Sequence, residues 1–147
     1  MKNGRMKHRV LFLCNGNSCR SQMAEALVNS QMNEEWEACS AGSAPTGFVH
    51  PMALQTLAEL GIQHHGWSKS MDEFRDQPFD LIVTVCEEAS ESCPVWLGKG
   101  VKIHMGFPDP AEATGSQEDV MNAFRMVRDT MLIKIPKILQ NWPNIHI

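Results

Sequence analysis

The chain has 147 residues, of which 43 % are hydrophobic and 20 % are charged, and its formal net charge at pH 7 is −4. This length and composition predict a single domain over residues 1–147, and the acidic balance argues against a nucleic-acid partner or a polybasic membrane contact. The apolar run at residues 10–14 is shorter than a signal peptide needs, and no run approaches a membrane span. We therefore expect a cytoplasmic protein.

Five cysteines are present, an odd number for a disulfide framework in a domain that has an adequate core. Their spacing contains no paired C-x-x-C motif, so the sequence predicts no zinc site and no other metal site. We expect reduced thiols at these positions, which are Cys14, Cys19, Cys39, Cys86 and Cys93.

Apolar periodicity and turn residues divide the chain into alternating strands and helices. Residues 1–8 are polar and form an expected N-terminal extension to an ordered core at about 9–140. Pro51 suits the first turn of a helix and Gly61 its end, and Ser116 is a predicted N-cap. In chain order the predicted elements are a strand at 9–13, a helix at 21–32, a strand at 36–41, a helix at 51–60, a short helix at 70–75, strands at 80–86 and 101–105, and a helix at 116–139, bent near Pro136.

This order predicts the α/β class, with an open parallel four-stranded sheet flanked by helices. Ligands of such sheets bind at the carboxyl ends of the strands, near a topological switch point. Two predicted strands end in cysteine, at Cys14 and at Cys86. If these strands are neighbours, both sulfur atoms lie at the same edge of the sheet.

The loop between the first predicted strand and the first predicted helix contains the most specific candidate for a functional site. A loop that leads into a helix N-terminus presents backbone N–H groups to a tetrahedral oxyanion. Cys14 begins this loop and Arg20 ends it, so that a sulfur and a guanidinium face one anion. The helix N-terminus and the cation favour the thiolate form of Cys14, to which Ser21 can add a hydrogen bond. The predicted oxyanion-binding residues are Asn15, Gly16, Asn17, Ser18, Cys19, Arg20 and Ser21.

Residues 14–21 resemble the phosphate loop of the low-molecular-weight protein tyrosine phosphatase superfamily. A second cysteine before Arg20, and Ser21-Gln22 after it, are closest to the thioredoxin-coupled arsenate reductase branch. The resemblance extends over residues 9–135. It implies the phosphatase-like fold, an arsenate substrate for which phosphate or sulfate is an analogue, and thioredoxin as the reducing partner, with no bound cofactor.

The same resemblance implies a relay of three cysteines. Cys14 attacks arsenate, Cys86 then attacks Cys14 and releases arsenite, and Cys93 takes over the disulfide, which thioredoxin reduces. A helix from Cys86 to Cys93 would separate their Cα atoms by about 10 Å, whereas a disulfide needs about 4.4–6.8 Å. We therefore expect residues 87–93 to unwind on oxidation and to be the most mobile part of the site.

Asp109, which precedes Pro110, is the candidate general acid, because a carboxylic acid can protonate the oxygen that sulfur expels. The superfamily places its acid in this Asp-Pro pair. The other reading of the pair is a simple turn.

The remaining candidates are assigned to packing or solvation. Cys19 is expected to fill space in the loop and Cys39 to lie in the core, while His64, His65 and His104 lack a ligand-like arrangement.

Some members of the reductase branch hold a structural potassium ion beside the loop. Residues matching Asn17, Glu25 and Ser40 of that site are present, but Lys69 stands where the site has an aspartate. An ammonium group there would replace the ion, so we expect no potassium dependence.

Two other functions remain open. The first is a phosphatase acting on phosphate monoesters, although the chain has no tyrosine, and Ala111 and Glu112 follow the Asp-Pro pair where such phosphatases often carry tyrosines. The second is a non-catalytic thiol protein that binds arsenite or senses oxidants, for which neither Arg20 nor Asp109 is needed. Glutathione with glutaredoxin is an alternative reductant.

Overall fold

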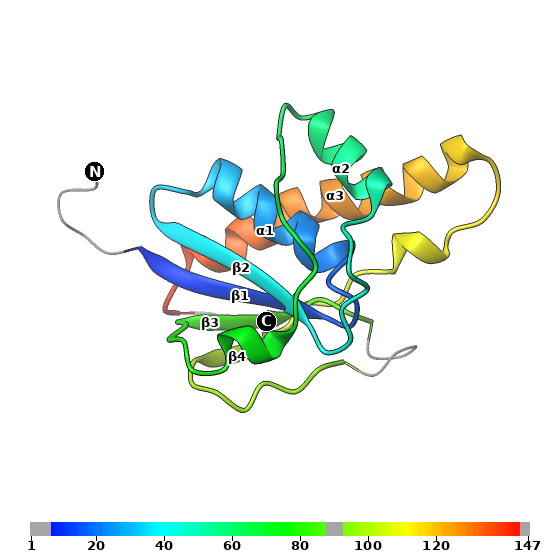
Figure 1. Cartoon of the computed structure of the whole chain (residues 1–147). Helices are drawn as coiled ribbons and strands as arrows, with labels where there is room; N and C mark the ends of the chain where they lie inside the picture. Colours follow the sequence, from blue (N-terminus) through cyan, green and yellow to red (C-terminus); the bar gives the residue numbers. More distant parts are fainter. Residues whose placement is uncertain (1–6, 88–92, 145–147) are drawn as a thin grey trace.

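Four parallel strands in the order β2-β1-β3-β4 form the centre of the molecule (Figure 1). The computed structural model describes residues 7–87 and 93–144. Within the described residues, no helix is long and apolar enough to cross a membrane. The elements are β1 (His8–Cys14), α1 (Arg20–Gln31), β2 (Trp36–Gly42), α2 (Pro51–Ala58), the 3-10 helix η1 (Met71–Phe74), β3 (Leu81–Thr84), β4 (Val101–His104), the 3-10 helix η2 (Pro110–Glu112) and α3 (Gln117–Gln140).

The α/β class and the four-stranded parallel sheet predicted from the sequence are confirmed, with differences at element ends. His8, assigned to the N-terminal extension, begins β1, while residues 1–6 of the expected extension lie outside the described part of the chain. The second helix ends at Ala58, before Gly61 with its positive φ of 77°, because the chain turns there toward Ile62. The short helix expected at 70–75 is a 3-10 turn.

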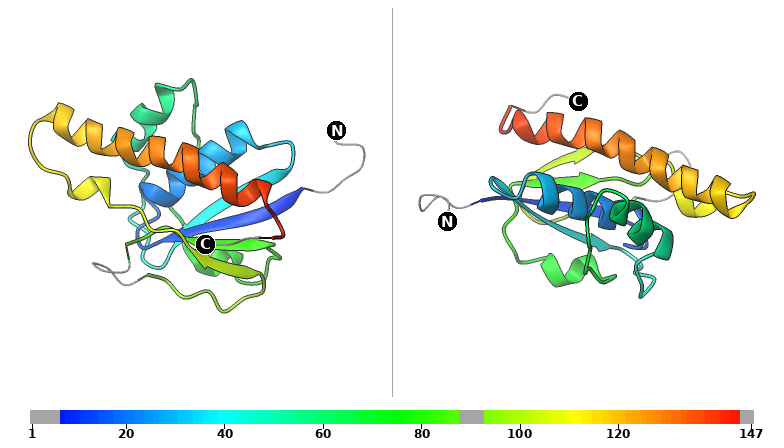
Figure 2. Two further views of the ribbon diagram at one scale, coloured as in Figure 1. Left: turned by 180° about the vertical axis from the view of Figure 1, so that it is seen from behind. Right: turned by 90° about the horizontal axis from the view of Figure 1, so that it is seen from above.

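The two faces of β1 pack into two separate cores. Val10 and Phe12 point to the face covered by the three α-helices, where Met23 of α1 and Phe124 of α3 are fully buried. The alternate residues, including Leu13, point to the opposite face and a smaller cluster around Trp96. Figure 2 shows α3 and η1 on opposite sides of the sheet, so the first strand is covered on both faces, as its unbroken apolar run predicts.

Strand pairing brings the ends of β1 and β3 together. Leu13 pairs with Thr84, and the Val85 N–H donates to the Leu13 carbonyl at 2.9 Å. The two strands that lead to Cys14 and Cys86 are therefore neighbours, which is the condition for both sulfur atoms to lie at the same edge of the sheet. The regular part of β3 ends two residues before Cys86, because β1 leaves the sheet at Cys14 and no longer offers a pairing partner.

Candidate active site

The loop between β1 and α1 is held open by neighbouring segments that bind its carbonyl groups. N–H groups of Ala44, Thr46 and His50 donate to the carbonyls of Asn15, Gly16 and Ser18, at 2.8, 3.0 and 3.0 Å respectively. Gly42 permits this approach, because a Cβ atom there would lie 2.4 Å from the Asn15 oxygen.

Asn17 adopts a positive φ of 49°, a conformation that asparagine tolerates better than most residues other than glycine. Since several loop carbonyls are bound from outside, the loop's N–H groups are left to face the concavity at the start of α1.

A directed chain of hydrogen bonds reaches the Cys14 thiol. The Asn17 Oδ1 accepts from the Lys69 backbone N–H and from Gln22 Nε2, both at 2.9 Å, which fixes the orientation of the amide. Asn17 Nδ2 therefore donates to Ser21 Oγ at 2.8 Å. Ser21 Oγ lies 2.8 Å from Cys14 Sγ, and its hydroxyl proton is available to the sulfur, although either atom can be the donor in this contact. This chain of hydrogen bonds places the Ser21 hydroxyl group against the sulfur of the predicted nucleophile.

Arg20 and Asp109 meet on the other side of the same cavity. The Arg20 side chain is only 6 % exposed, its Nη1 donates to the Phe107 carbonyl at 3.1 Å, and its Nη2 lies 3.7 Å from Asp109 Oδ2. Asp109 Oδ1 accepts from the Ala111 N–H at 3.0 Å, which caps η2. One carboxylate oxygen thus holds the turn while the other faces the guanidinium.

These groups enclose a cavity of about 210 Å³, large enough for a tetrahedral oxyanion. It contains a nucleophile, a buried cation and a carboxyl group. Its lining residues are Cys14, Gly16, Ser18, Cys19, Arg20, Thr46, Phe48, His50, Asp109 and Ala111.

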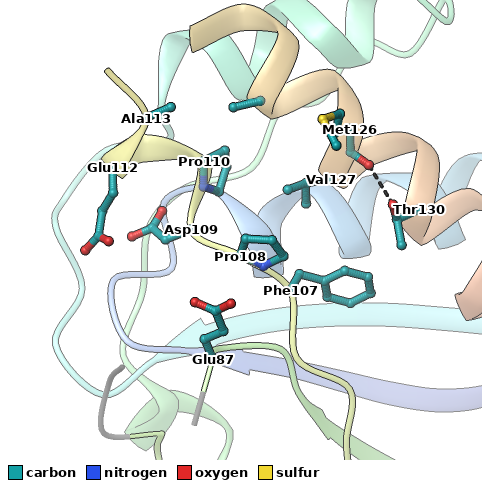
Figure 3. Close-up of a pocket in the computed structure, with 11 residues that line it drawn as sticks. Glu87, Phe107, Pro108, Asp109, Pro110, Glu112, Ala113, Met126, Val127 and Thr130 are labelled. Carbon is teal, nitrogen blue, oxygen red and sulfur yellow. Dashed lines mark hydrogen bonds between the residues drawn. The ribbon is translucent and has the colours of Figure 1, made fainter. Parts of the chain in front are cut away.

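A larger cavity of about 420 Å³ lies beside this one, between the Asp-Pro turn and α3. Figure 3 shows Glu87 and Asp109 with their carboxylates at one end of it, and Met126 and Val127 of α3 across from them. Neither Cys14 nor Arg20 lines the larger cavity, so the nucleophile and the cation both face the smaller one. Asp109 lines both cavities.

The other cysteines occupy distinct environments. Cys86 and Cys93 were expected from the cysteine count to be reduced, but they are joined by a disulfide with a Cα–Cα distance of 5.8 Å, whereas Cys14 is a buried free thiol. Burial, reinforced by the nearby Asp109 charge, raises the pKa of Cys19 to about 12, so Cys19 stays protonated in the loop. Burial also raises the pKa of Cys39, which lies away from the cavity. The expectation of mobility at residues 87–93 falls largely on residues 88–92, which are outside the described part of the chain.

The predicted replacement of a potassium ion can be tested on the donor atoms. Ser40 Oγ donates to Glu25 Oε1 at 2.7 Å, and Lys69 Nζ lies 3.7 Å from the same oxygen. The ammonium also donates to the Trp67 carbonyl at 2.9 Å, and the Lys69 side chain is 4 % exposed. Because the ammonium takes these oxygen atoms, the residues present do not fit a bound potassium ion. Among the described residues, no group of three or more His, Cys, Asp or Glu side chains is placed to hold a metal.

Two further residues of the site were not found from the sequence. Gln22 follows the loop in α1 and joins His64 to Asn17, with His64 Nε2 2.7 Å from Gln22 Oε1. His50 lines the anion cavity from the start of α2. Gln22 stands in the quoted Ser21-Gln22 pair, but no sequence pattern marks His50.

Known proteins resemble this chain in both sequence and fold. The low molecular weight phosphotyrosine protein phosphatase family matches residues 9–142. An arsenate reductase of Halalkalibacterium halodurans is 41 % identical over 124 residues, 84 % of this chain and 88 % of that protein. An arsenate reductase of Bacillus subtilis is 38 % identical over 126 residues, 84 % of this chain and 90 % of that protein.

Among solved structures, an arsenate reductase from Archaeoglobus fulgidus superposes with a TM-score of 0.64 at 35 % identity. The superposition covers 83 % of this chain and 98 % of that one. Because the family match spans nearly the whole chain and includes the loop, this protein belongs to the low molecular weight phosphotyrosine protein phosphatase family.

Proposed function

We propose that this protein is a cytoplasmic arsenate reductase that acts as one domain and is regenerated by thioredoxin. One observation carries the proposal: a disulfide between Cys86 and Cys93 lies at the sheet edge where the Cys14 loop begins. A phosphatase needs only the loop cysteine, the arginine and an acid. A dithiol pair beside them supplies two electrons.

The first step is the attack of the Cys14 thiolate on the arsenic of an arsenate ion held by the loop and by Arg20. An As–O bond breaks, and the oxygen leaves as water after Asp109 donates a proton to it. The product is an arsenic(V) adduct on Cys14.

The second step reduces the arsenic. The Cys86 sulfur attacks Cys14, the S–As bond breaks, and its electron pair stays on arsenic, which leaves as arsenite. A Cys14–Cys86 disulfide remains. Cys93 then attacks Cys86, releases the Cys14 thiolate and gives the Cys86–Cys93 disulfide. A dithiol of thioredoxin reduces this bond, so the cycle needs no bound cofactor.

The decisive experiment measures arsenate-dependent NADPH oxidation with thioredoxin and thioredoxin reductase. The wild type is compared with Cys86→Ser and Cys93→Ser, and with Cys39→Ser as a matched control outside the cavity. We expect turnover to be lost in the first two variants and kept in the control. If the protein instead hydrolyses aryl phosphates through Cys14 and is indifferent to Cys86 and Cys93, it is a phosphatase.

The remaining alternative, a thiol protein that only binds arsenite, predicts a different response at Arg20. Arg20 is buried in the anion cavity, where its guanidinium offers a fork of donors that suits an anion ligand. We expect Arg20→Lys to abolish arsenate turnover while thiol-based binding of arsenite remains.

A further inference from the structure

His50 is held against the anion cavity by contacts on three sides. Its backbone N–H donates to the Ser18 carbonyl in the loop at 3.0 Å, and its Nδ1 accepts from the Met52 N–H at 3.1 Å, which caps α2. Its ring packs on Phe124 of α3, with the ring centroids 4.8 Å apart. The imidazole is therefore fixed in place before any anion binds.

These contacts also determine where the ring carries its proton. Because Nδ1 accepts a hydrogen bond from a backbone N–H, the proton of the neutral ring is on Nε2. Burial lowers the pKa of His50, and the nearby Asp109 charge only partly offsets this effect. At neutral pH the ring is thus uncharged, with an N–H at Nε2.

The mouth of the cavity offers few other donors. Thr46 Oγ1 donates to the Phe48 carbonyl at 3.0 Å, so its proton is already used. Phe48 and Ala111 have no polar side-chain atom, and Asp109 is the candidate acid. Among the described residues that line this cavity, only Arg20 and His50 have a side-chain N–H.

We propose that His50 Nε2–H is a substrate-binding donor for the oxyanion oxygen that points away from the loop. The loop N–H groups and Arg20 hold the inner oxygens, and His50 holds the outer one without adding a second positive charge. For arsenate as the anion the inference rests on the proposed function; for a tetrahedral oxyanion in general it rests on the cavity alone.

Two substitutions distinguish the proposed role of His50 as a donor to the anion from its role as the N-cap of α2. His50→Asn keeps a side-chain oxygen that can accept from the Met52 N–H, but it loses the nitrogen that faces the cavity. His50→Gln places an amide N–H near the former Nε2 position, but it loses the short cap. Binding of inorganic phosphate to each reduced variant is measured by calorimetry, and the melting temperature is measured without phosphate.

We expect His50→Asn to bind phosphate about tenfold more weakly than the wild type, with a melting temperature close to the wild-type value. His50→Gln should keep phosphate affinity within about twofold and melt about 2–4 °C lower. In arsenate turnover, His50→Asn should raise KM more than it lowers kcat.

Unchanged phosphate affinity in His50→Asn would overturn the proposal. So would phosphate affinities that simply follow the melting temperatures, because a purely structural role predicts that order. Phosphate binding does not depend on arsenate reduction. A protein that fails to reduce arsenate, yet shows the expected phosphate pattern, would contradict only the proposed function.

Discussion

The direction of each hydrogen bond decides what the residues around Cys14 do. A backbone N–H and Gln22 both donate to the Asn17 oxygen, so the Asn17 amide nitrogen donates to Ser21. The Ser21 hydroxyl proton is then available to the Cys14 sulfur. The cysteine and arginine were evident from the sequence as a motif with five intervening residues. The orientation of the Asn17 amide was not, because the Lys69 N–H comes from a loop 52 residues away.

Removal of the Ser21 hydroxyl tests this chain. We expect Ser21→Ala to slow alkylation of Cys14 by iodoacetamide about tenfold near pH 6, because a hydrogen bond to a charged acceptor contributes about 1.5–3 kcal/mol. The alkylation rate is followed by mass spectrometry on the reduced protein. Ser30→Ala is the control, since Ser30 is exposed on α1. Equal rates in Ser21→Ala and in the wild type would show that the hydroxyl does not stabilise the thiolate.

The role of Lys69 depends on the burial of its side chain, which is 4 % exposed. Replacing it with alanine leaves Glu25 without its cation, and breaking a partly buried ion pair in this way costs about 3 kcal/mol. We expect Lys69→Ala to be destabilised by about this amount in urea unfolding. We also expect potassium to recover part of the loss.

The measurement compares potassium and sodium chloride at equal ionic strength. The wild type should show no preference between the two salts, and neither should Lys102→Ala, whose lysine is exposed. A clear gain of wild-type stability in potassium would mean that the ion binds in spite of Lys69.

At the level of elements, apolar runs predicted all four strands, of which β1 and β3 are the most continuously buried. β4 was predicted although its first two residues are exposed. Element ends were less predictable. The sequence motif at 80–86 reads as one strand, but its pairing stops where β1 turns into the loop, a limit imposed by another part of the chain. His50 could not be predicted as a site residue for the same reason, because its contacts to Ser18 and Phe124 join segments far apart in the sequence.

The junction of α2 and α3 makes an electrostatic prediction. Hydrogen bonds from Arg125 and Arg128 lower the pKa of Glu59 to about 2, from an ordinary value of 4.5. A carboxylate with a depressed pKa stabilises the folded state above pH 4.5, and this contribution disappears as the pH falls toward 2. Because the Glu59 side chain is 36 % exposed, salt also weakens it.

We expect Glu59→Gln to be less stable than the wild type by a constant amount between pH 6 and 8. This difference should shrink between about pH 4.5 and 2, as Glu59 becomes protonated in the wild type. Urea unfolding across this range gives the comparison, with Glu118→Gln as the control, since Glu118 is 70 % exposed and contacts Arg125. A gap that stays constant down to pH 2 would rule out the ion pairs as its cause.

At the scale of the whole molecule, the anion loop joins most of the structural elements. It connects β1 to α1, its carbonyls accept from the segment that follows β2, and its Ser18 is bound by the residue that caps α2. Arg20 ties the loop to the segment before η2 through the Phe107 carbonyl. An anion in the loop therefore contacts groups that only the folded chain brings together, and it should stabilise the fold as a whole.

Ligand linkage gives the size of this effect. An anion that binds only the folded state adds about 2.7 kcal/mol of stability when its concentration is 100 times its dissociation constant. For a chain of this length we expect phosphate at that concentration to raise the melting temperature of the reduced protein by about 5–10 °C. Potassium chloride at equal ionic strength should not have this effect. In Arg20→Lys, which keeps the charge but loses the planar fork, most of the phosphate-induced rise should disappear. An equal rise in both proteins would place the bound phosphate outside the Cys14 loop.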